Sequence, residues 1–483
     1  MATSGGRALE MAVDQTGNSY QLSATSMDGG GLLSKIGPSG EMIWQEPIPG
    51  LSSNSAVVLA PSGAVHIASR SDIGFYIARY GPNSELQWSV DHDFGSSLCA
   101  VRDMAIGHDG NVLVTGASYG ITGYDAATVS YDSLGNLLWA AEYDHNSSSF
   151  GDHGLAVDVD LNGNTYVTGS SVDVELGTIV LLSYTPDGTL RWVRRTSPGY
   201  QSWANAVVVN QQQEIIIAGR YDGPAQGDFL CAAYDTSGNP LWTTIEDIAY
   251  EDRVVDMKLD GAGNIYILGK EHDSGSPDIA LLALSPTGGF RWVRTYGSLS
   301  GSDSASDLAI GTNGHIHVTG HGPDSLNNHS WSTYVLRYDP DGDLVWEGRY
   351  FSPQPWTHTT SSSIGSDGSD NIYVFGEQCS IPIICHLYVA KYGWSVPVDD
   401  VTLEGSNIVR YGHDARTITI DFTPIWTGPF KVVIMDVSGR ILETYSTSDR
   451  TVTMHAEHLP PSVYMVRLTD ASGRSVTNKL LCY

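Results

Sequence analysis

A repeat of about fifty residues runs through most of this chain and limits the folds that it can adopt. One marker is the residue after the first turn of each copy, which recurs at Asn18, Ala64, Asn111, Asn164, Glu214, Asn264, His315 and Asn371. A second marker is tryptophan, which recurs at Trp44, Trp88, Trp139, Trp192, Trp242, Trp292 and Trp346 and has no equivalent in the eighth copy. The spacing predicts eight repeated structural units.

Each copy contains four short runs in which apolar residues alternate with polar ones, as residues 155–195 show most clearly. This period is typical of β-strands. In the first turn, D-x-x-G-N, the Asp caps the turn and the Gly takes a left-handed conformation. The second turn, Y-D-x-x-G-x-x-x-W, repeats this device. Four antiparallel strands per copy predict an all-β fold, an eight-bladed β-propeller over residues 1–395 with the tryptophans between blades. Seven blades remain the alternative if the first or last copy is peripheral.

The pattern VDxxGNxYVTGxS followed by YDxxGxxxW resembles the repeats of secreted bacterial β-propeller proteins over about residues 8–394. It is more distantly similar to the propeller repeats of the pyrroloquinoline-quinone type. The resemblance implies a fold and leaves the activity open, because such rings carry many unrelated functions. The adjacent Cys pair that quinone-dependent dehydrogenases typically place against their cofactor is missing from this sequence.

The eighth copy ends after its third strand, since Tyr392 is followed by Gly393, Trp394 and VPVDD. In the middle copies, the Trp precedes the next inner strand by 14 to 17 residues. A Trp with the same spacing to Glu10 would fall before Met1. We therefore expect the natural chain to continue upstream, with a closing strand and a signal peptide, which the first residues of this sequence do not show.

Residues 396–483 have shorter alternating strands without the tryptophan marker, which predicts a separate small β-sandwich. Three pieces resemble the C-terminal sorting domain of the type IX secretion system: FKVVIMDVSGR, HLPPSVYMVRL and the terminal NKLLCY. The matching residues are Asp436, Gly439, Arg440, Tyr464 and Lys479. Ser462 departs from the family, which usually has Gly before the aromatic residue. The resemblance implies export, with the secretion machinery as partner and no activity of the domain's own. The alternative is a plain sandwich, for example a binding module.

The net charge of −29 makes nucleic acid and anionic membranes poor partners. Nearly all of this charge, −27, lies before residue 396. No apolar run is long enough to cross a bilayer. Five cysteines are too few for a disulfide scaffold, but Cys379 and Cys385 lie close enough in sequence to form one disulfide in an oxidising compartment. The alternative is two buried thiols.

Two acidic turns have spacings that fit a calcium loop. The first contains Asp158, Asp160 and Asn162, and the second contains Asp339, Asp341 and Asp343. Both stretches align with a turn found in the other repeats, so hairpin capping explains them without metal. No cofactor is required by the sequence, and calcium remains a candidate.

Acidic residues also recur on the predicted innermost strands, where equivalent positions face one another around the ring. Eight residues before the first marker lie Glu10, Asp103, Asp256 and Asp307, and a second set, Asp125, Asp228 and Asp278, precedes the third strand. Clustered carboxylates bind cations or polar ligands such as sugars and raise one another's pKa values. The alternative is that they accept hydrogen bonds from neighbouring backbone.

The sequence therefore indicates an exported protein, released or held at the cell surface, that binds or scaffolds an unidentified extracellular protein or glycan. The alternative is an enzyme, a hydrolase or lyase that acts on polysaccharides with carboxylates on one face of the ring.

Overall fold

The computed structural model describes residues 6–25, 30–48, 51, 55–96, 98–120, 123–145, 151–173, 176–196, 202–222, 227–248, 253–273, 276–297, 303–323, 331–350, 358–380, 384–393, 409–412, 417–421, 430–436, 441–448, 451–455, 462–470 and 475–482. The chain divides into two compact units, Met1–Trp394 and Ser395–Tyr483. All regular elements in the described ranges are β-strands, and none of these ranges holds a helix able to span a membrane.

The first unit consists of antiparallel sheets whose strands follow one another in chain order, and we number these sheets 1 to 8. Sheet 1 holds β1 (Gly6–Val13), β2 (Ser19–Thr25), β3 (Gly31–Ile36) and β4 (Met42–Ile48). Sheet 2 holds β5 (Ala56–Leu59), β6 (Val65–Arg70), β7 (Gly74–Tyr80) and β8 (Leu86–Asp93). Sheet 3 holds β9 (Ala100–Ile106), β10 (Val112–Tyr119), β11 (Tyr124–Tyr131) and β12 (Leu137–Tyr143). Sheet 4 holds β13 (Asp152–Val159), β14 (Thr165–Asp173), β15 (Leu176–Tyr184) and β16 (Leu190–Thr196).

The remaining sheets of this unit repeat the same order. Sheet 5 holds β17 (Trp203–Val209), β18 (Ile215–Asp222), β19 (Gly227–Tyr234) and β20 (Pro240–Glu246). Sheet 6 holds β21 (Arg253–Leu259), β22 (Ile265–Asp273), β23 (Ser276–Leu284) and β24 (Phe290–Tyr296). Sheet 7 holds β25 (Ser304–Ile310), β26 (Ile316–Pro323), β27 (Trp331–Tyr338) and β28 (Leu344–Tyr350). Sheet 8 has three strands in the described residues, β29 (His358–Ser366), β30 (Ile372–Ser380) and β31 (Ile384–Tyr392).

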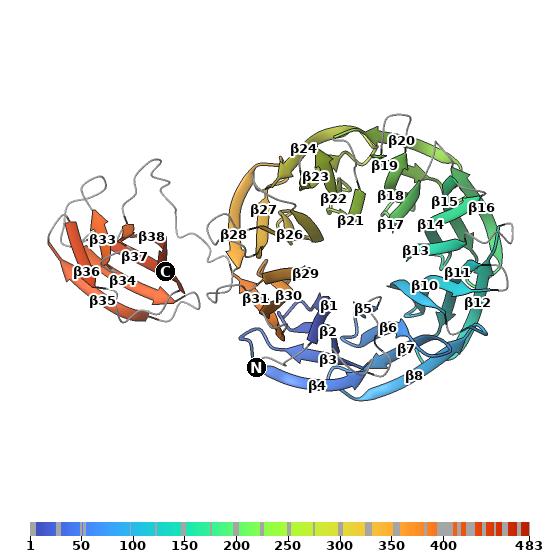
Figure 1. Ribbon diagram of the computed structural model, residues 1–483, viewed down its shortest axis with the longest axis horizontal. Helices are drawn as coiled ribbons and strands as arrows, with labels where there is room; N and C mark the ends of the chain where they lie inside the picture. The colour runs from blue at the N-terminus through green and yellow to red at the C-terminus, as the bar shows by residue number, and fades with distance from the viewer. Residues whose placement is uncertain are drawn as a thin grey trace. The chain divides into compact units, whose positions relative to one another are not determined.

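The sheets stand in a ring, with first strands such as β1, β5 and β17 around its centre and fourth strands such as β4, β8 and β16 along its perimeter (Figure 1). Apolar side chains of neighbouring sheets pack together, so that Phe229 of β19 and Ile267 of β22 share one buried cluster. The core is therefore divided into layers between the sheets. This arrangement is a β-propeller, and the prediction of an all-β propeller is confirmed.

In sheets 1, 4, 6 and 8, one carboxylate caps the first turn, at Asp14, Asp160, Asp260 and Asp367. Asp160 is buried, and its Oδ1 accepts the backbone N–H groups of Asn162 and Asn164 at 2.9 and 2.8 Å. Its Oδ2 accepts the Asn164 side-chain amide at 2.7 Å and the Tyr166 hydroxyl at 3.0 Å. Gly163 follows with a φ of 78°, a conformation that glycine adopts without strain. The recurring D-x-x-G-N sequence is therefore a self-contained capped turn.

The ring closes where sheet 8 meets sheet 1. Ser362 Oγ of β29 donates to the Ala8 carbonyl of β1 at 3.1 Å, and Gly368 N donates to the Gln15 carbonyl at 3.1 Å. Tyr373 and Phe375 of β30 pack with Ala8 in a buried cluster. Contacts between sheets 8 and 1 thus join the two ends of the repeat array.

The second unit contains two antiparallel sheets. One has the strand order β32-β33-β36, with β32 (Val409–Gly412), β33 (Thr417–Asp421) and β36 (Thr451–His455). The other has the order β35-β34-β37-β38, with β34 (Phe430–Asp436), β35 (Ile441–Thr447), β37 (Ser462–Asp470) and β38 (Ser475–Cys482). Val432, Ile434 and Val466 are buried in the four-stranded sheet and supply its core.

Candidate functional site

A β-bulge interrupts the first strand of seven sheets, and β5 pairs without one over its described length. The bulge falls directly before each acidic residue of the first predicted set, at Leu9, Arg102, Val255 and Ser306. A bulge adds one unpaired residue, bends the strand and turns the next side chain in a new direction. The pairing around the bulge therefore sets where the carboxylates point.

Three of the four carboxylates reach from their own sheet to the first strand of the next sheet. Each accepts a backbone N–H there at 2.8 Å: Glu10 from Val57, Asp103 from Val157, and Asp307 from Ile364. Asp307 also accepts the Ser363 hydroxyl at 2.8 Å. These residues brace neighbouring sheets, which is the backbone-bonding alternative that the sequence left open.

Asp158 belongs to the same group, although its sequence suggested a calcium loop. It lies on β13, two residues after Ala156, so it faces the same side of the strand. Its Oδ2 accepts the Val209 N–H of the next sheet at 2.7 Å, and its Oδ1 accepts the Val159 N–H at 2.8 Å. The alternation of side chains along a strand could have predicted this role of Asp158 from the sequence.

Asp256 behaves differently because a lysine lies beside it. Its Oδ1 accepts the Met257 N–H at 2.8 Å and the Lys258 Nζ at 3.0 Å, and Nζ also lies 3.0 Å from Oδ2. The Lys258 side chain is 48% exposed. Sequence reasoning overlooked Lys258, whose position two residues after Asp256 places both side chains on one face of β21.

The pKa values connect these side chains electrostatically. Burial raises the pKa of Glu10 to about 8, opposed by its bond from Val57 and assisted by the charges of Asp103 and Asp307. Burial also raises the pKa of Asp103 and of Asp307 to about 6 each. Partial burial lowers the pKa of Lys258, but the charges of Asp256 and Asp307 outweigh this effect and raise it. We call Glu10, Asp103, Asp256, Lys258 and Asp307 the central cluster.

The second predicted acidic set lies elsewhere. Asp125, Asp228 and Asp278 stand on the third strands β11, β19 and β23, paired with Ser118, Tyr221 and Glu271 of the second strands. These residues are therefore separated from the inner strands by a whole strand. Burial, together with the charges of Asp144 and Glu142, raises the pKa of Asp125 to about 6. The structure does not bring this set into the central cluster.

The two calcium candidates are capped turns in the structure. Both oxygens of Asp160 are engaged within its own turn, and Asn162 contributes its backbone N–H there. In the second turn, Asp339 Oδ1 accepts the N–H groups of Asp341 and Asp343 at 3.0 and 2.8 Å. Hydrogen bonding accounts for both turns, and calcium binding stays a prediction.

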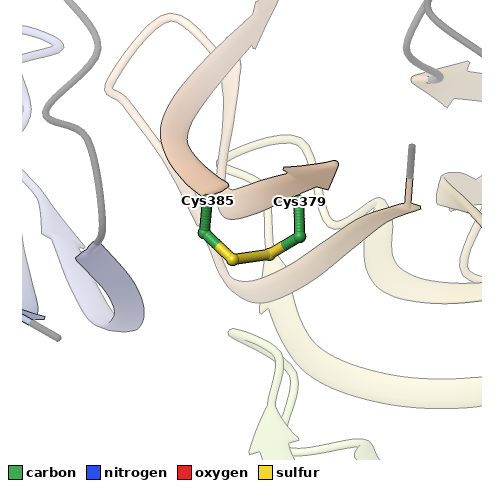
Figure 2. The surroundings of a disulfide bond; sticks show 2 residues. All are labelled: Cys379 and Cys385. Carbon is green, nitrogen blue, oxygen red and sulfur yellow. A yellow bond between two sulfur atoms is a disulfide. The ribbon is translucent and has the colours of Figure 1, made fainter. Parts of the chain in front are cut away.

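Cys379 and Cys385 form a disulfide between β30 and β31, where they are direct cross-strand partners (Figure 2). The bond ties the second and third strands of sheet 8 together. Glu377 lies close by, but sulfur atoms joined in a disulfide are not thiolate ligands, so this trio forms no metal site.

The three pieces that resemble a sorting domain meet in one sheet of the second unit. Strand β34 pairs with β37, with Asp436 opposite Tyr464, and β37 pairs with β38, with Met465 opposite Lys479. Gly439 and Arg440 lie outside the described residues. Segments that are far apart in sequence are thus neighbours in the fold.

No protein-family model and no curated protein matches the chain. Among solved structures, it is similar to PorZ, a surface component of the type IX secretion system of Porphyromonas gingivalis, at 11% identity and a TM-score of 0.38 over 98% of this chain and 69% of that one. It is also similar to an ulvan lyase, a polysaccharide lyase, at 10% identity and a TM-score of 0.44 over 70% and 95%. A Bacteroides caccae protein of unknown function matches at 14% identity and a TM-score of 0.35 over 56% and 93%. The fold assignment rests on the sheets and registers described above.

Proposed function

We propose that sheets 1 to 8 are the blades of an eight-bladed propeller that binds a neutral, hydroxyl-rich ligand such as a glycan at the ring centre. The central cluster supports this proposal, because the Lys258 ammonium bonds the Asp256 carboxylate at 3.0 Å and the charges of Asp103 and Asp307 also act on it. Lysine supplies donors, and carboxylates supply acceptors. Sugar hydroxyls need both.

The same contacts favour binding over catalysis. Glu10, Asp103 and Asp307 each hold a backbone N–H of the next sheet, and Asp256 holds Lys258. The positive charge of Lys258 also repels a metal cation, which would have to displace the ammonium from Asp256. The cluster therefore suits a neutral polar ligand better than a metal ion.

A glycan array, combined with a calcium titration followed by thermal unfolding, tests this function. We expect wild type to bind one class of glycan and the variant Lys258→Met to bind it at least about tenfold more weakly, since a hydrogen bond to a charged group contributes about 1.5–3 kcal/mol. Failure to bind any glycan, together with an unchanged melting temperature in calcium, would count against a ligand site in the ring.

An enzyme that acts on polysaccharides is the second candidate, and the raised pKa of Glu10 is the observation that favours it. A carboxyl group that keeps its proton near neutral pH can act as a general acid. Incubation with a panel of polysaccharides, followed by an assay for new chain ends, tests this alternative. Product formation by wild type and its loss in Glu10→Gln would replace binding with catalysis as the function.

We propose further that the second unit is a β-sandwich that directs export by the type IX pathway to the cell surface or the medium. The pairing of the three motif pieces in one sheet supports this role. The experiment is secretion of a reporter fused to residues 395–483 in a bacterium that has this pathway. Export should stop when β38 is deleted, and a reporter that leaves the cell without β38 would contradict the assignment.

A further inference from the structure

The disulfide of sheet 8 lies on a face that also carries an acidic side chain. Cys379 of β30 and Cys385 of β31 stand directly opposite each other (Figure 2). Glu377 precedes Cys379 by two residues, so both side chains lie on the same face of β30. A carboxylate oxygen of Glu377 and the two sulfur atoms all lie within 4.8 Å of one another. We call Glu377, Cys379 and Cys385 the sulfur–carboxylate trio.

The face that carries the trio is turned toward sheet 1. Leu387, which stands opposite Glu377 on β31, packs against the buried cluster that contains Ala8. The Glu377 carboxylate accepts the backbone N–H of Ala8. The three side chains of the trio are half-buried. They are therefore held by neighbouring groups and still within reach of solvent.

The pairing of the strands keeps the two cysteines together independently of the covalent bond. On one side of the disulfide Gln378 pairs with His386, and on the other side Ser380 pairs with Ile384. The Cα atoms of the two cysteines are 4.0 Å apart. Two free thiols at these positions would therefore still face each other, with the carboxylate beside them.

The chemistry of this donor set suits zinc. Zn²⁺ binds both thiolate sulfur and carboxylate oxygen, and three protein ligands leave the fourth position of a tetrahedral site to water. Two thiolates and one carboxylate supply ample negative charge, which the nearby charge of Arg7 offsets only in part. Calcium prefers about six to eight oxygen ligands, so it does not fit this set.

We propose that Glu377, Cys379 and Cys385 bind Zn²⁺ once the disulfide has been reduced. A dithiol transfers two electrons and two protons to the sulfur atoms, the S–S bond breaks, and the dithiol itself becomes a disulfide. Zn²⁺ then binds both sulfurs as thiolates and releases their protons. The hairpin of β30 and β31 is thereby cross-linked in both states, by a covalent bond under oxidising conditions and by zinc under reducing ones. None of these residues belongs to the central cluster, so this site is independent of glycan binding.

A zinc titration of the full chain in its two redox states tests the proposal. One sample keeps the disulfide, and the other is reduced with dithiothreitol, which is then removed by gel filtration in the absence of oxygen. Competition with a chromogenic zinc chelator measures the bound metal. We expect the reduced sample to bind about one Zn²⁺ per chain more than the oxidised sample. Zinc should also raise the melting temperature of the reduced sample and leave that of the oxidised sample unchanged.

The variant Glu377→Gln tests the carboxylate ligand. It keeps both thiols and an acceptor for the Ala8 N–H, so the fold around the hairpin should be preserved. We expect its reduced form to bind Zn²⁺ at least about tenfold more weakly than reduced wild type, because loss of a group that merely orients a metal ligand already costs about 10–100-fold in affinity.

A pair of cysteine variants tests the sulfur ligands. The double variant Cys379→Ser with Cys385→Ser should lose the additional zinc. Cys99→Ser is the matched control, because Cys99 is a buried free thiol outside the trio whose Sγ donates to the Ser96 carbonyl at 3.2 Å. A serine hydroxyl can keep that bond, and this variant should bind zinc as wild type does. With Co²⁺ in place of Zn²⁺, the thiolate-to-metal absorption band should appear in Cys99→Ser and be missing from the double variant.

Several results would overturn the proposal. These are equal zinc binding by reduced and oxidised wild type, undiminished affinity in Glu377→Gln, or retention of the additional zinc in the double cysteine variant. Loss of that zinc in Cys99→Ser would move the site away from the trio. Circular dichroism of the reduced protein checks that the strands stay paired, and a reduced chain that unfolds and does not refold with Zn²⁺ would also contradict the proposal.

Discussion

Glu10 has two opposing effects on stability: it links two sheets by a hydrogen bond, and its charged form is unfavourable where it is buried. Its carboxylate braces sheet 1 to sheet 2 through Val57 N, yet burial raises its pKa from 4.5 to about 8. The unfolded chain therefore gives up this proton at lower pH than the folded chain does. The contribution of Glu10 to stability is fully present below pH 4.5 and is lost as the pH rises through about 8.

The variant Glu10→Gln keeps an acceptor for Val57 N–H and removes the titration. We expect it to be more stable than wild type at pH 8 by at least about 1 kcal/mol, since one pKa unit corresponds to about 1.4 kcal/mol. At pH 4 the two proteins should be nearly equal. Chemical denaturation at both pH values measures the difference, and a variant less stable than wild type at pH 8 would contradict a raised pKa for Glu10.

Asp370 is a second residue with opposing effects, because its backbone conformation is strained while its carboxylate accepts stabilising hydrogen bonds. Its φ is 63°, at a turn position where most repeats have glycine. Its carboxylate accepts Arg337 Nη2 at 3.0 Å and Asn313 Nδ2 at 2.7 Å, from sheet 7 and its first turn. Burial raises the pKa of Asp370, but the hydrogen bond and charge of His317 and the charge of Arg337 outweigh this and lower it.

The variant Asp370→Gly should therefore lose about 2–4 kcal/mol at pH 7, because it leaves the 8% exposed Arg337 without its carboxylate. Because the pKa of Asp370 is lowered, this loss should shrink as the pH falls below about 4. Gln213→Gly is the control at the same turn position, with the same φ of 63°. It should stay within about 1 kcal/mol of wild type in urea unfolding, and equal losses in both variants would refute this role of Asp370.

At the scale of elements, the junction between sheets explains why two sequence markers recur together. The glycine of a second turn packs against the tryptophan of the preceding repeat, as Gly288 packs against Trp242. A larger side chain at this glycine would overlap the indole. Neither residue reveals this pairing alone, because they lie in different copies. The pairing becomes visible only once the sheets are placed side by side in the ring.

The variant Gly288→Ala should be destabilised by about 2 kcal/mol more than Gly63→Ala. Both glycines have a positive φ, 78° and 80°, so the backbone cost is the same. The added Cβ at Gly288 would meet the Trp242 ring at 2.4 Å, whereas at Gly63 it would meet nothing within 4 Å. Thermal unfolding of the two variants makes the comparison. Equal destabilisation would show that the Trp242 indole moves aside without an energetic cost.

At the scale of the whole molecule, the repeat predicted the order of strands, the capped turns and the ring. The sequence also placed Glu10, Asp103, Asp256 and Asp307 at one level of the inner strands. It could not show that a bulge precedes each of them, or that three of them reach the next sheet. Lys258 was not found by comparing the acidic positions of the repeats, because it is basic. It contacts Asp256 because both side chains lie on one face of β21.

We propose that the centre of the ring holds a single binding site. A propeller that binds through its repeated outer surfaces would offer several equivalent sites, whereas the central cluster offers one. Isothermal titration of the strongest glycan from the array into wild type and Lys258→Met measures this directly. We predict one ligand per chain and binding at least about tenfold weaker in the variant. Several ligands per chain, or equal affinity in the two proteins, would contradict the claim.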